Sequence, residues 1–346
     1  MSFARIDGWR IAGVATCVPP RVVDNLDTGK TFGEEEVRKV VAMAGVDRRH
    51  VVEPGTTSAD LCFEAAAELL QRLGWEPGSV TGLIMITQSP DYFLPSSACM
   101  VHKWLGLSDQ CAAFDVGLGC SGYPYGLYIA AAMLKAVGQQ RILVLHGETP
   151  SRFPAPDDHA TTLLFGDAGS ATALVPDADA GAAHFCLQTD GRGYGGLIIR
   201  GGGFRDRIPE NPRDLALHMD GAGIFNFTIK RVPALIADTL KFAGSTVADV
   251  DWFVFHQSNR FIMKFLAKKC GLPEAKLPLV LSDYGNSGGA SVPLAMTQAL
   301  PQQREHAAQV MLVGYGVGLS WASALLPLAA DAVLAHRVYS GEVARA

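Results

Sequence analysis

Three residues in this sequence carry side chains whose types and surroundings suit catalysis on an acyl group. The first, Cys120, stands in Gly119-Cys120-Ser121-Gly122, between an apolar run and a stretch of helical periodicity. A thiol at such a junction faces the positive end of the helix dipole, which favours the thiolate. The glycines on either side permit a sharp turn and the close approach of a substrate. Cys120 is therefore a candidate nucleophile.

His256 and Asn286 offer polar groups that could serve beside such a thiol. His256 follows the apolar run 253–255, and a neutral imidazole there can donate a hydrogen bond to a thioester carbonyl or take up a proton. Asn286 offers an amide that does not titrate and can stabilise an enolate oxygen. Each also has an ordinary interpretation, as a histidine that closes a strand and an asparagine in a turn. Gly316-Val317-Gly318 adds backbone N–H groups, which suit either an oxyanion or a plain hairpin.

An internal repeat connects these residues. Gly119-Cys120-Ser121-Gly122 resembles Gly285-Asn286-Ser287-Gly288, and the runs 83–89 and 141–145 resemble 253–258 and 309–313. The matched positions are 166 (286 − 120), 169 (257 − 88) and 168 (309 − 141) residues apart. The repeat predicts two similar halves, 1–180 and 181–346, that place a cysteine in one half and a histidine and an asparagine in the other at equivalent strand ends. We expect the three to converge on one pocket.

The composition excludes several classes of protein. With 346 residues, 49% hydrophobic and 18% charged, the chain can form a large core and is not disordered. A net charge of -5 does not provide the positively charged surface that nucleic-acid binding requires. No window approaches the roughly 20 apolar residues of a membrane helix, and the N-terminus lacks a signal-peptide pattern. The seven cysteines include no Cys-x-x-Cys pair, so we expect neither a disulfide framework nor a metal site, and a cytoplasmic location.

Short apolar runs that alternate with helical periodicity predict a layered α/β fold with largely parallel sheets. The predicted strands are 83–87, 113–116, 142–145, 172–175, 252–255, 310–313 and 323–326, and the predicted helices are 58–73, 122–137, 259–269 and 293–300. The first helix should open on a cap at Ser58-Ala59-Asp60. Residues 311–330 indicate two buried strands joined by a glycine turn. The segment 190–213 should be irregular, and the seam between the halves should lie at 176–181.

Taken together, these segments resemble the β-ketoacyl-acyl carrier protein synthase III group of the thiolase superfamily from about Ile11 to Leu326. The motifs that carry the resemblance are Phe114-Asp115-Val116 with Gly119-Cys120-Ser121-Gly122, Leu164-Phe165-Gly166-Asp167-Ala168-Gly169, His256-Gln257-Ser258-Asn259, Gly285-Asn286-Ser287 with Ala290-Ser291-Val292-Pro293, and the run 318–325. The resemblance implies a five-layered αβαβα thiolase-like fold made of two duplicated halves, and a homodimer.

The resemblance also implies a ping-pong mechanism. Cys120 would take an acyl group from a thioester while the N–H groups of Cys120 and Val317 hold the oxyanion. His256 and Asn286 would then stabilise the enolate formed as a malonyl-carrier thioester loses carbon dioxide, and this carbanion would attack the acyl-cysteine. The phosphopantetheine tunnel would be lined by Arg152, Gly221, Phe225, Asn259 and Leu94. No cofactor or metal would be permanently bound, and the substrates and partners would be acyl-CoA and acyl carrier protein in fatty-acid, specialised lipid or polyketide synthesis.

Lys39 and Met43 stand where typical members have the Trp and Arg that sandwich the adenine of coenzyme A. An acyl-carrier donor is therefore also compatible with the sequence. Two other functions remain open: transfer of the acyl group to an amine or alcohol without decarboxylation, and a non-catalytic partner subunit, although such subunits usually lose the cysteine or the histidine. A hydroxymethylglutaryl-type synthase is disfavoured because the sequence does not place the glutamate base of that branch.

Overall fold

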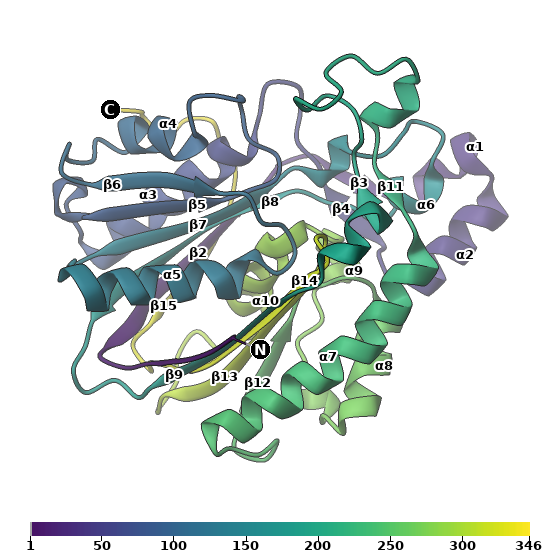
Figure 1. Ribbon diagram of the computed structural model, residues 1–346. Helices are drawn as coiled ribbons and strands as arrows, with labels where there is room; N and C mark the ends of the chain where they lie inside the picture. The colour runs from purple at the N-terminus through teal and green to yellow at the C-terminus, as the bar shows by residue number, and fades with distance from the viewer. Residues whose placement is uncertain (1) are drawn as a thin grey trace.

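Two sheets of equivalent design form the centre of the molecule. The computed structural model describes residues 2–346, and Figure 1 shows the two sheets stacked with helices between and outside them. The six-stranded sheet has the order β15 (Val333–Val338), β2 (Trp9–Val18), β8 (Ala168–Pro176), β7 (Ile142–Glu148), β5 (Gly82–Ile86), β6 (Ala112–Val116). The five-stranded sheet has the order β1 (Ser2–Ile6), β9 (Ala183–Thr189), β14 (Ser320–Leu328), β13 (Ala308–Gly316), β12 (Trp252–Phe255).

The inner strands of the two sheets repeat one another, as the sequence repeat predicts. The order β2-β8-β7-β5 in one sheet corresponds to β9-β14-β13-β12 in the other. The orientations match as well: the first two pairs in each series are antiparallel and the third is parallel. By this correspondence β7 is equivalent to β13. The carboxyl ends of these two strands approach the loops that carry Asn286 and Cys120.

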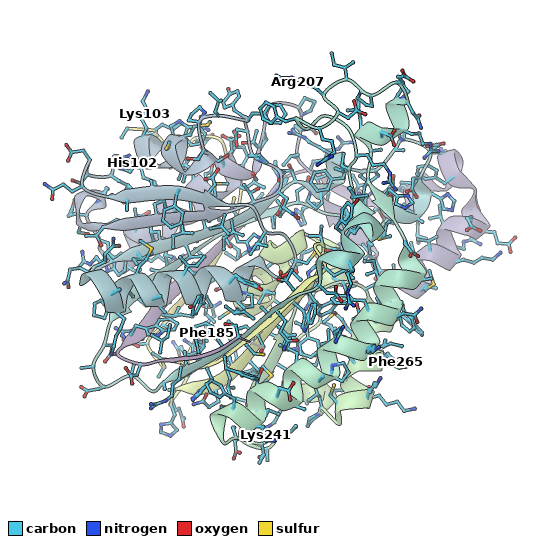
Figure 2. All side chains as sticks on the ribbon, viewed as in Figure 1. His102, Lys103, Phe185, Arg207, Lys241 and Phe265 are labelled. Carbon is cyan, nitrogen blue, oxygen red and sulfur yellow. The ribbon has the colours of Figure 1, made fainter. Side chains whose placement is uncertain are left out.

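Helices complete five layers, which agrees with the expected αβαβα fold. Helices α5 (Gly122–Val137) and α10 (Ser291–Ala299) lie between the sheets, where their apolar side chains share one core with both inner sheet faces. Figure 2 shows Phe185, a fully buried residue of β9, near α5 in this core. Helices α3 (Ser58–Leu73) and α4 (Ser97–Trp104) cover the outer face of the larger sheet. Helices α7 (Gly221–Ala243) and α8 (Arg260–Cys270) cover the outer face of the smaller one.

Smaller elements complete the chain around these layers. They are β3 (Val22–Asp24), α1 (Gly29–Phe32), α2 (Glu34–Ala44), β4 (Arg48–His50), α6 (His159–Thr162), β10 (Leu197–Ile198), β11 (His218–Met219) and α9 (Leu281–Tyr284). The segment 190–213, expected to be irregular, holds two short 3-10 turns and β10, and it pairs with β11.

Two sequence-based expectations need correction. The sheets are mixed rather than largely parallel, because β8 and β14 each run antiparallel to both inner neighbours. Helix α3 is capped by Thr57 rather than by Ser58, through a capping box in which Thr57 and Asp60 each bind the other's backbone N–H. The expected pair of strands with a glycine turn is confirmed as the antiparallel hairpin β13–β14.

The terminal strands exchange between the two sheets. The N-terminal strand β1 pairs with β9 in the smaller sheet, and the C-terminal strand β15 pairs with β2 in the larger one. The chain passes from the larger sheet to the smaller one between β8 and β9, at the predicted seam 176–181. A division into halves 1–180 and 181–346 stays a prediction, since each terminal strand completes the sheet of the other half.

Candidate active site

Cys120 lies in the turn between β6 and α5, directly beneath the end of β13. A Cβ atom built at Gly316 would lie 3.0 Å from its Sγ, and one at Gly314 would lie 2.5 Å from its carbonyl oxygen. Such spacing leaves no room for a side chain at either position. The glycines of β13 therefore allow the strand to pass close to the cysteine.

The surroundings of the Cys120 thiol oppose its ionisation. Burial and the nearby Glu148 carboxyl raise the pKa of Cys120 to about 12, although the Val317 backbone N–H, directed at the sulfur, lowers it. The sequence predicted a stabilised thiolate at this helix start. The structure corrects this prediction, because loss of hydration outweighs the favourable N–H groups. The N–H of Val317 points to the sulfur, and its role as an oxyanion group stays a prediction.

His256 follows β12 and is held by one of its ring nitrogens. Its backbone N–H donates to Val313 (2.7 Å), while its Nδ1 lies 2.9 Å from the carbonyl oxygen of Gly288. A carbonyl only accepts, so Nδ1 carries the proton and Nε2 presents a lone pair. Burial lowers the pKa of His256 to about 4. The ring is therefore neutral, and it can donate from Nε2 only after it takes up a second proton. This corrects the prediction that a neutral imidazole at this position donates the hydrogen bond.

The amide of Asn286 is fixed in one orientation by its neighbours. Its Oδ1 accepts a hydrogen bond from the Gly288 backbone N–H at 3.0 Å, and its Nδ2 donates to the Ser258 carbonyl at 3.3 Å. A carboxamide nitrogen has two hydrogens, so one N–H of Asn286 remains for a substrate oxygen. This arrangement agrees with the predicted role of a donor that does not titrate.

A cavity of about 210 Å³ opens beside Cys120. Its lining is largely apolar and comprises Gln88, Gly119, Cys120, Glu148, Pro150, Phe153, Phe165, Leu197, Ile198, Ile199, Leu217, Gly288 and Val317. His256 and Asn286 are not in the lining itself. Both bind Gly288, which is, so the structure brings the three predicted residues around one cavity wall.

The five residues expected to line a phosphopantetheine tunnel do not line this cavity. Arg152 donates to the carbonyl oxygens of Glu53 and Thr56, and the side chain of Asn259 caps α8 by accepting from Ile262.

Of the other three, Gly221 and Leu94 are exposed and Phe225 is half-buried. Gly221 opens α7, Phe225 stacks on the exposed Phe261 at 5.8 Å, and the Leu94 side chain is 79% exposed. Their tunnel role stays a prediction.

Glu148, the last residue of β7, is a cavity residue that the sequence analysis missed. It is 2% exposed, and its Oε1 and Oε2 accept hydrogen bonds from the Gln88 backbone N–H and the Ser89 hydroxyl, both at 3.0 Å. Burial raises the pKa of Glu148 to about 8. The sequence did contain a signal for Glu148. The apolar run 142–145 continues into His146-Gly147-Glu148, and the repeat makes these three residues equivalent to Gly314-Tyr315-Gly316.

Two kinds of feature are absent from residues 2–346. No cluster of three or more His, Cys, Asp or Glu side chains in this part of the chain could hold a metal ion. None of the helices described is both long enough and apolar enough to span a bilayer.

Comparisons with known proteins agree with the fold. Residues 114–191 match the family model for 3-oxoacyl-[acyl-carrier-protein] synthase III, and residues 240–328 match the model for its C-terminal part. The β-ketoacyl-[acyl-carrier-protein] synthase III of Neisseria meningitidis serogroup B is 33% identical over 318 residues, covering 92% of this chain and 98% of that protein.

Solved structures extend this similarity. The crystal structure of a 3-oxoacyl-(acyl-carrier protein) synthase from Burkholderia xenovorans LB400 superposes with a TM-score of 0.94 at 40% identity, covering 97% of this chain and 99% of that one. The priming β-ketosynthase of the R1128 polyketide pathway superposes with a TM-score of 0.85 at 27% identity, covering 94% of this chain and 98% of that one.

Proposed function

The chain belongs to the 3-oxoacyl-[acyl-carrier-protein] synthase III family, and from this premise we propose how its residues divide the work of decarboxylative condensation. The enzyme is an acyltransferase of the 2.3.1 class, which joins an acyl group to a malonyl-carrier thioester and yields a β-ketoacyl product with loss of carbon dioxide. The observation that carries the assignment of residues is the cavity at Cys120, which has the Val317 N–H aimed at the sulfur.

In the first half-reaction, the sulfur of Cys120 attacks the thioester carbonyl of the acyl donor. The carbonyl oxygen gains negative charge, and the backbone N–H groups of Cys120 and Val317 stabilise it. Cys120 transfers its proton to the departing thiol, so that an acyl-enzyme and a free thiol result. The apolar cavity wall, which includes Phe153, Ile198 and Leu217, accepts the acyl chain.

In the second half-reaction, His256 and Asn286 hold the carbonyl oxygen of the malonyl thioester. The free N–H of Asn286 donates to this oxygen directly. His256 takes up a proton from solvent as the malonyl thioester enters, donates from Nε2 as the imidazolium because Nδ1 is already committed to Gly288, and returns that proton to solvent when the product leaves. The enolate charge that develops as carbon dioxide leaves favours this second proton on the ring. The carbanion then attacks the acyl-cysteine.

Acyl-CoA and acyl carrier protein are the proposed donors and partners, with no permanently bound cofactor. Lys39 pairs with Glu35 at 2.8 Å, and the Met43 side chain is 64% exposed. Neither side chain offers an aromatic face for the adenine of coenzyme A, which favours an acyl-carrier donor. The seven free cysteines support a reducing location such as the cytoplasm.

A homodimer would complete the larger sheet. Strand β6 is an outer strand of that sheet, so a second copy can pair with its free edge. Nearby, Phe93 and Leu94 are 63% and 79% exposed, and Phe93 lies 5.4 Å from the exposed ring of Phe204. Figure 2 shows the adjoining Arg207 in an outer loop of the molecule. We expect light scattering to give twice the chain mass, and Leu94→Asp to weaken the dimer.

Trapping of the acyl-enzyme tests the reaction. The protein is incubated with a panel of acyl-CoA and acyl-carrier donors, and the mass of intact protein is measured, followed by malonyl-dependent release of carbon dioxide. We expect one acyl group per chain on the wild type and none on Cys120→Ala. Normal labelling of Cys120→Ala would remove the nucleophile assignment. Acyl transfer to an amine or alcohol with no carbon dioxide released would favour the non-decarboxylating alternative.

A further inference from the structure

Glu148 is a buried acid that lines the catalytic cavity and has no role in the two half-reactions described so far. Glu148 and Cys120 line the same cavity, and the Glu148 carboxyl is near enough to the Cys120 thiol for its charge to raise the pKa of that thiol. The Glu148 side chain packs against Gly288, where a Cβ atom would lie 2.9 Å from the Glu148 Cγ. Two donors, the Gln88 backbone N–H and the Ser89 hydroxyl, hold its oxygens. The carboxyl is thus fixed at a defined place in the reaction chamber.

The groups that face Glu148 favour its protonated form. The cavity lining contains no lysine or arginine. His146 on the same strand places Nε2 4.0 Å from Oε1, but burial lowers the pKa of His146 to about 3, so this ring is neutral. Neither ring nitrogen of His146 has a hydrogen-bond partner among the described residues. From the start of β8, Asp167 adds a like charge. No cationic side chain therefore compensates an ionised Glu148, the two hydrogen bonds from residues 88 and 89 offset the effect of burial only in part, and the group is a neutral acid below about pH 8.

The condensation half-reaction needs such an acid. When the carbanion has attacked, the tetrahedral intermediate collapses, the C–Sγ bond breaks and its electron pair stays on the sulfur. The departing carbon dioxide carries no proton, so one proton must enter per turnover to restore the thiol. A thiolate in this apolar cavity is a strong base.

We propose that Glu148 donates this proton: its O–H bond breaks, an S–H bond forms on Cys120, and the resulting carboxylate regains a proton from solvent once the product has left. The inference rests on the proposed function, since it names the acid of the same condensation. The transfer is downhill, because the pKa of Cys120 at about 12 lies above that of Glu148 at about 8. The alternative donor is the imidazolium of His256.

Glu148→Gln tests the proposal with little change of shape. The amide can keep both hydrogen bonds with residues 88 and 89, but it cannot supply a proton. Acylation is measured as the single-turnover burst of released thiol, and condensation as steady-state β-ketoacyl product between pH 6 and 10. We expect an acylation burst within about twofold of the wild type and a condensation rate lower by about 10²-fold, the usual contribution of one acid. The wild-type rate should fall as pH rises through about 8, and the variant should lack this fall.

Two further variants separate proton donation from a structural role. Glu148→Asp keeps an acid and should recover part of the condensation rate. Ser89→Ala removes a hydrogen bond that lowers the pKa of Glu148, so the alkaline fall in rate should move to higher pH. If Glu148 had only a structural role, the Ser89→Ala change would not move the pH at which the condensation rate falls. Thermal unfolding of each variant checks that the fold is kept.

The proposal is overturned if Glu148→Gln condenses at the wild-type rate with the wild-type pH profile, because another group, such as His256, then supplies the proton. It is also overturned if Ser89→Ala leaves the alkaline fall where it was. The proposed function itself fails differently: the wild type would then form no malonyl-dependent product at any pH. The two failures are distinguished by the wild-type reaction alone.

Discussion

β7 and β13 are equivalent strands in the two repeats, yet their carboxyl ends differ: β7 ends with polar side chains, and β13 has glycines at the equivalent positions. At β13, Gly314 and Gly316 pass over the loop that holds Cys120. At β7, the residues 168 positions earlier are His146 (314 − 146) and Glu148 (316 − 148), which pack over the loop at Gly288 and Gly289. In the first case the loop carries the reactive side chain and the strand is bare. In the second the strand carries the side chains, and the loop residues that face them, Gly288 and Gly289, have none.

This difference shows how a duplicated fold makes one asymmetric site. At each crossing of strand and loop only one side chain fits, because a Cβ atom at Gly316 or Gly288 would lie 3.0 Å or less from a side-chain atom of Cys120 or Glu148. One repeat therefore places a thiol in the cavity and the other leaves space for a carboxyl.

Removal of the imidazole should separate the two half-reactions most strongly. In His256→Ala, acyl labelling of Cys120 should persist, because the oxyanion groups there come from Cys120 and Val317. Decarboxylation and condensation should fall by about 10²- to 10³-fold, the effect of losing one donor to a developing oxyanion. Labelling is followed by intact mass and decarboxylation by carbon dioxide release. Loss of labelling in parallel with decarboxylation would mean that His256 serves the first half-reaction as well.

A methyl group at the β13 crossing should damage the nucleophile. In Gly316→Ala the new Cβ lies 3.0 Å from Sγ, so the sulfur or the strand must move. A shift near 1 Å at a reacting atom costs about 10²-fold in rate, and we expect that loss in the acylation burst. A burst at the wild-type rate would show that the β13 glycines are not required for the approach to Cys120.

A methyl group at the β7 crossing should spare the nucleophile and disturb the other loop. Gly288 has φ of +59°, so Gly288→Ala adds backbone strain of about 1–2 kcal/mol besides its contact with Glu148. We expect condensation to fall by about 10-fold and acylation by less than about twofold, since Gly288 orients His256 and Asn286. Equal losses in both half-reactions would contradict this division of the site.

The acid at the β7 crossing should also make stability depend on pH. Glu148 takes up a proton on folding between its ordinary pKa of 4.5 and about 8. The native state then binds more protons than the unfolded state, so this group lowers stability as pH rises through that window, by at most about 1.4 kcal/mol per pH unit. Denaturant unfolding at pH 5 and pH 8 should therefore show a smaller decline for Glu148→Gln than for the wild type. An unchanged decline would place the proton uptake elsewhere.

Much of the fold could be predicted from local patterns. The short apolar runs correctly predicted strands β5, β7, β12 and β13, because strands that are buried on both faces are apolar throughout. The prediction of largely parallel sheets was wrong because strand direction depends on how each strand returns to its neighbour, which periodicity does not report. The terminal strands β1 and β15 were missed because their partners are distant in the sequence.

The sequence by itself determined the repeat, the positions of Cys120, His256 and Asn286 at strand ends, and the family to which they point, because motifs and spacing are local properties of the chain. Only the tertiary structure decided which of these groups carries a proton. The neutral state of Glu148, the Nδ1–H form of His256 and the raised pKa of Cys120 follow from burial and from partners far apart in sequence. The physical reason is that loss of water sets the energy of a charge, and only the folded chain excludes water.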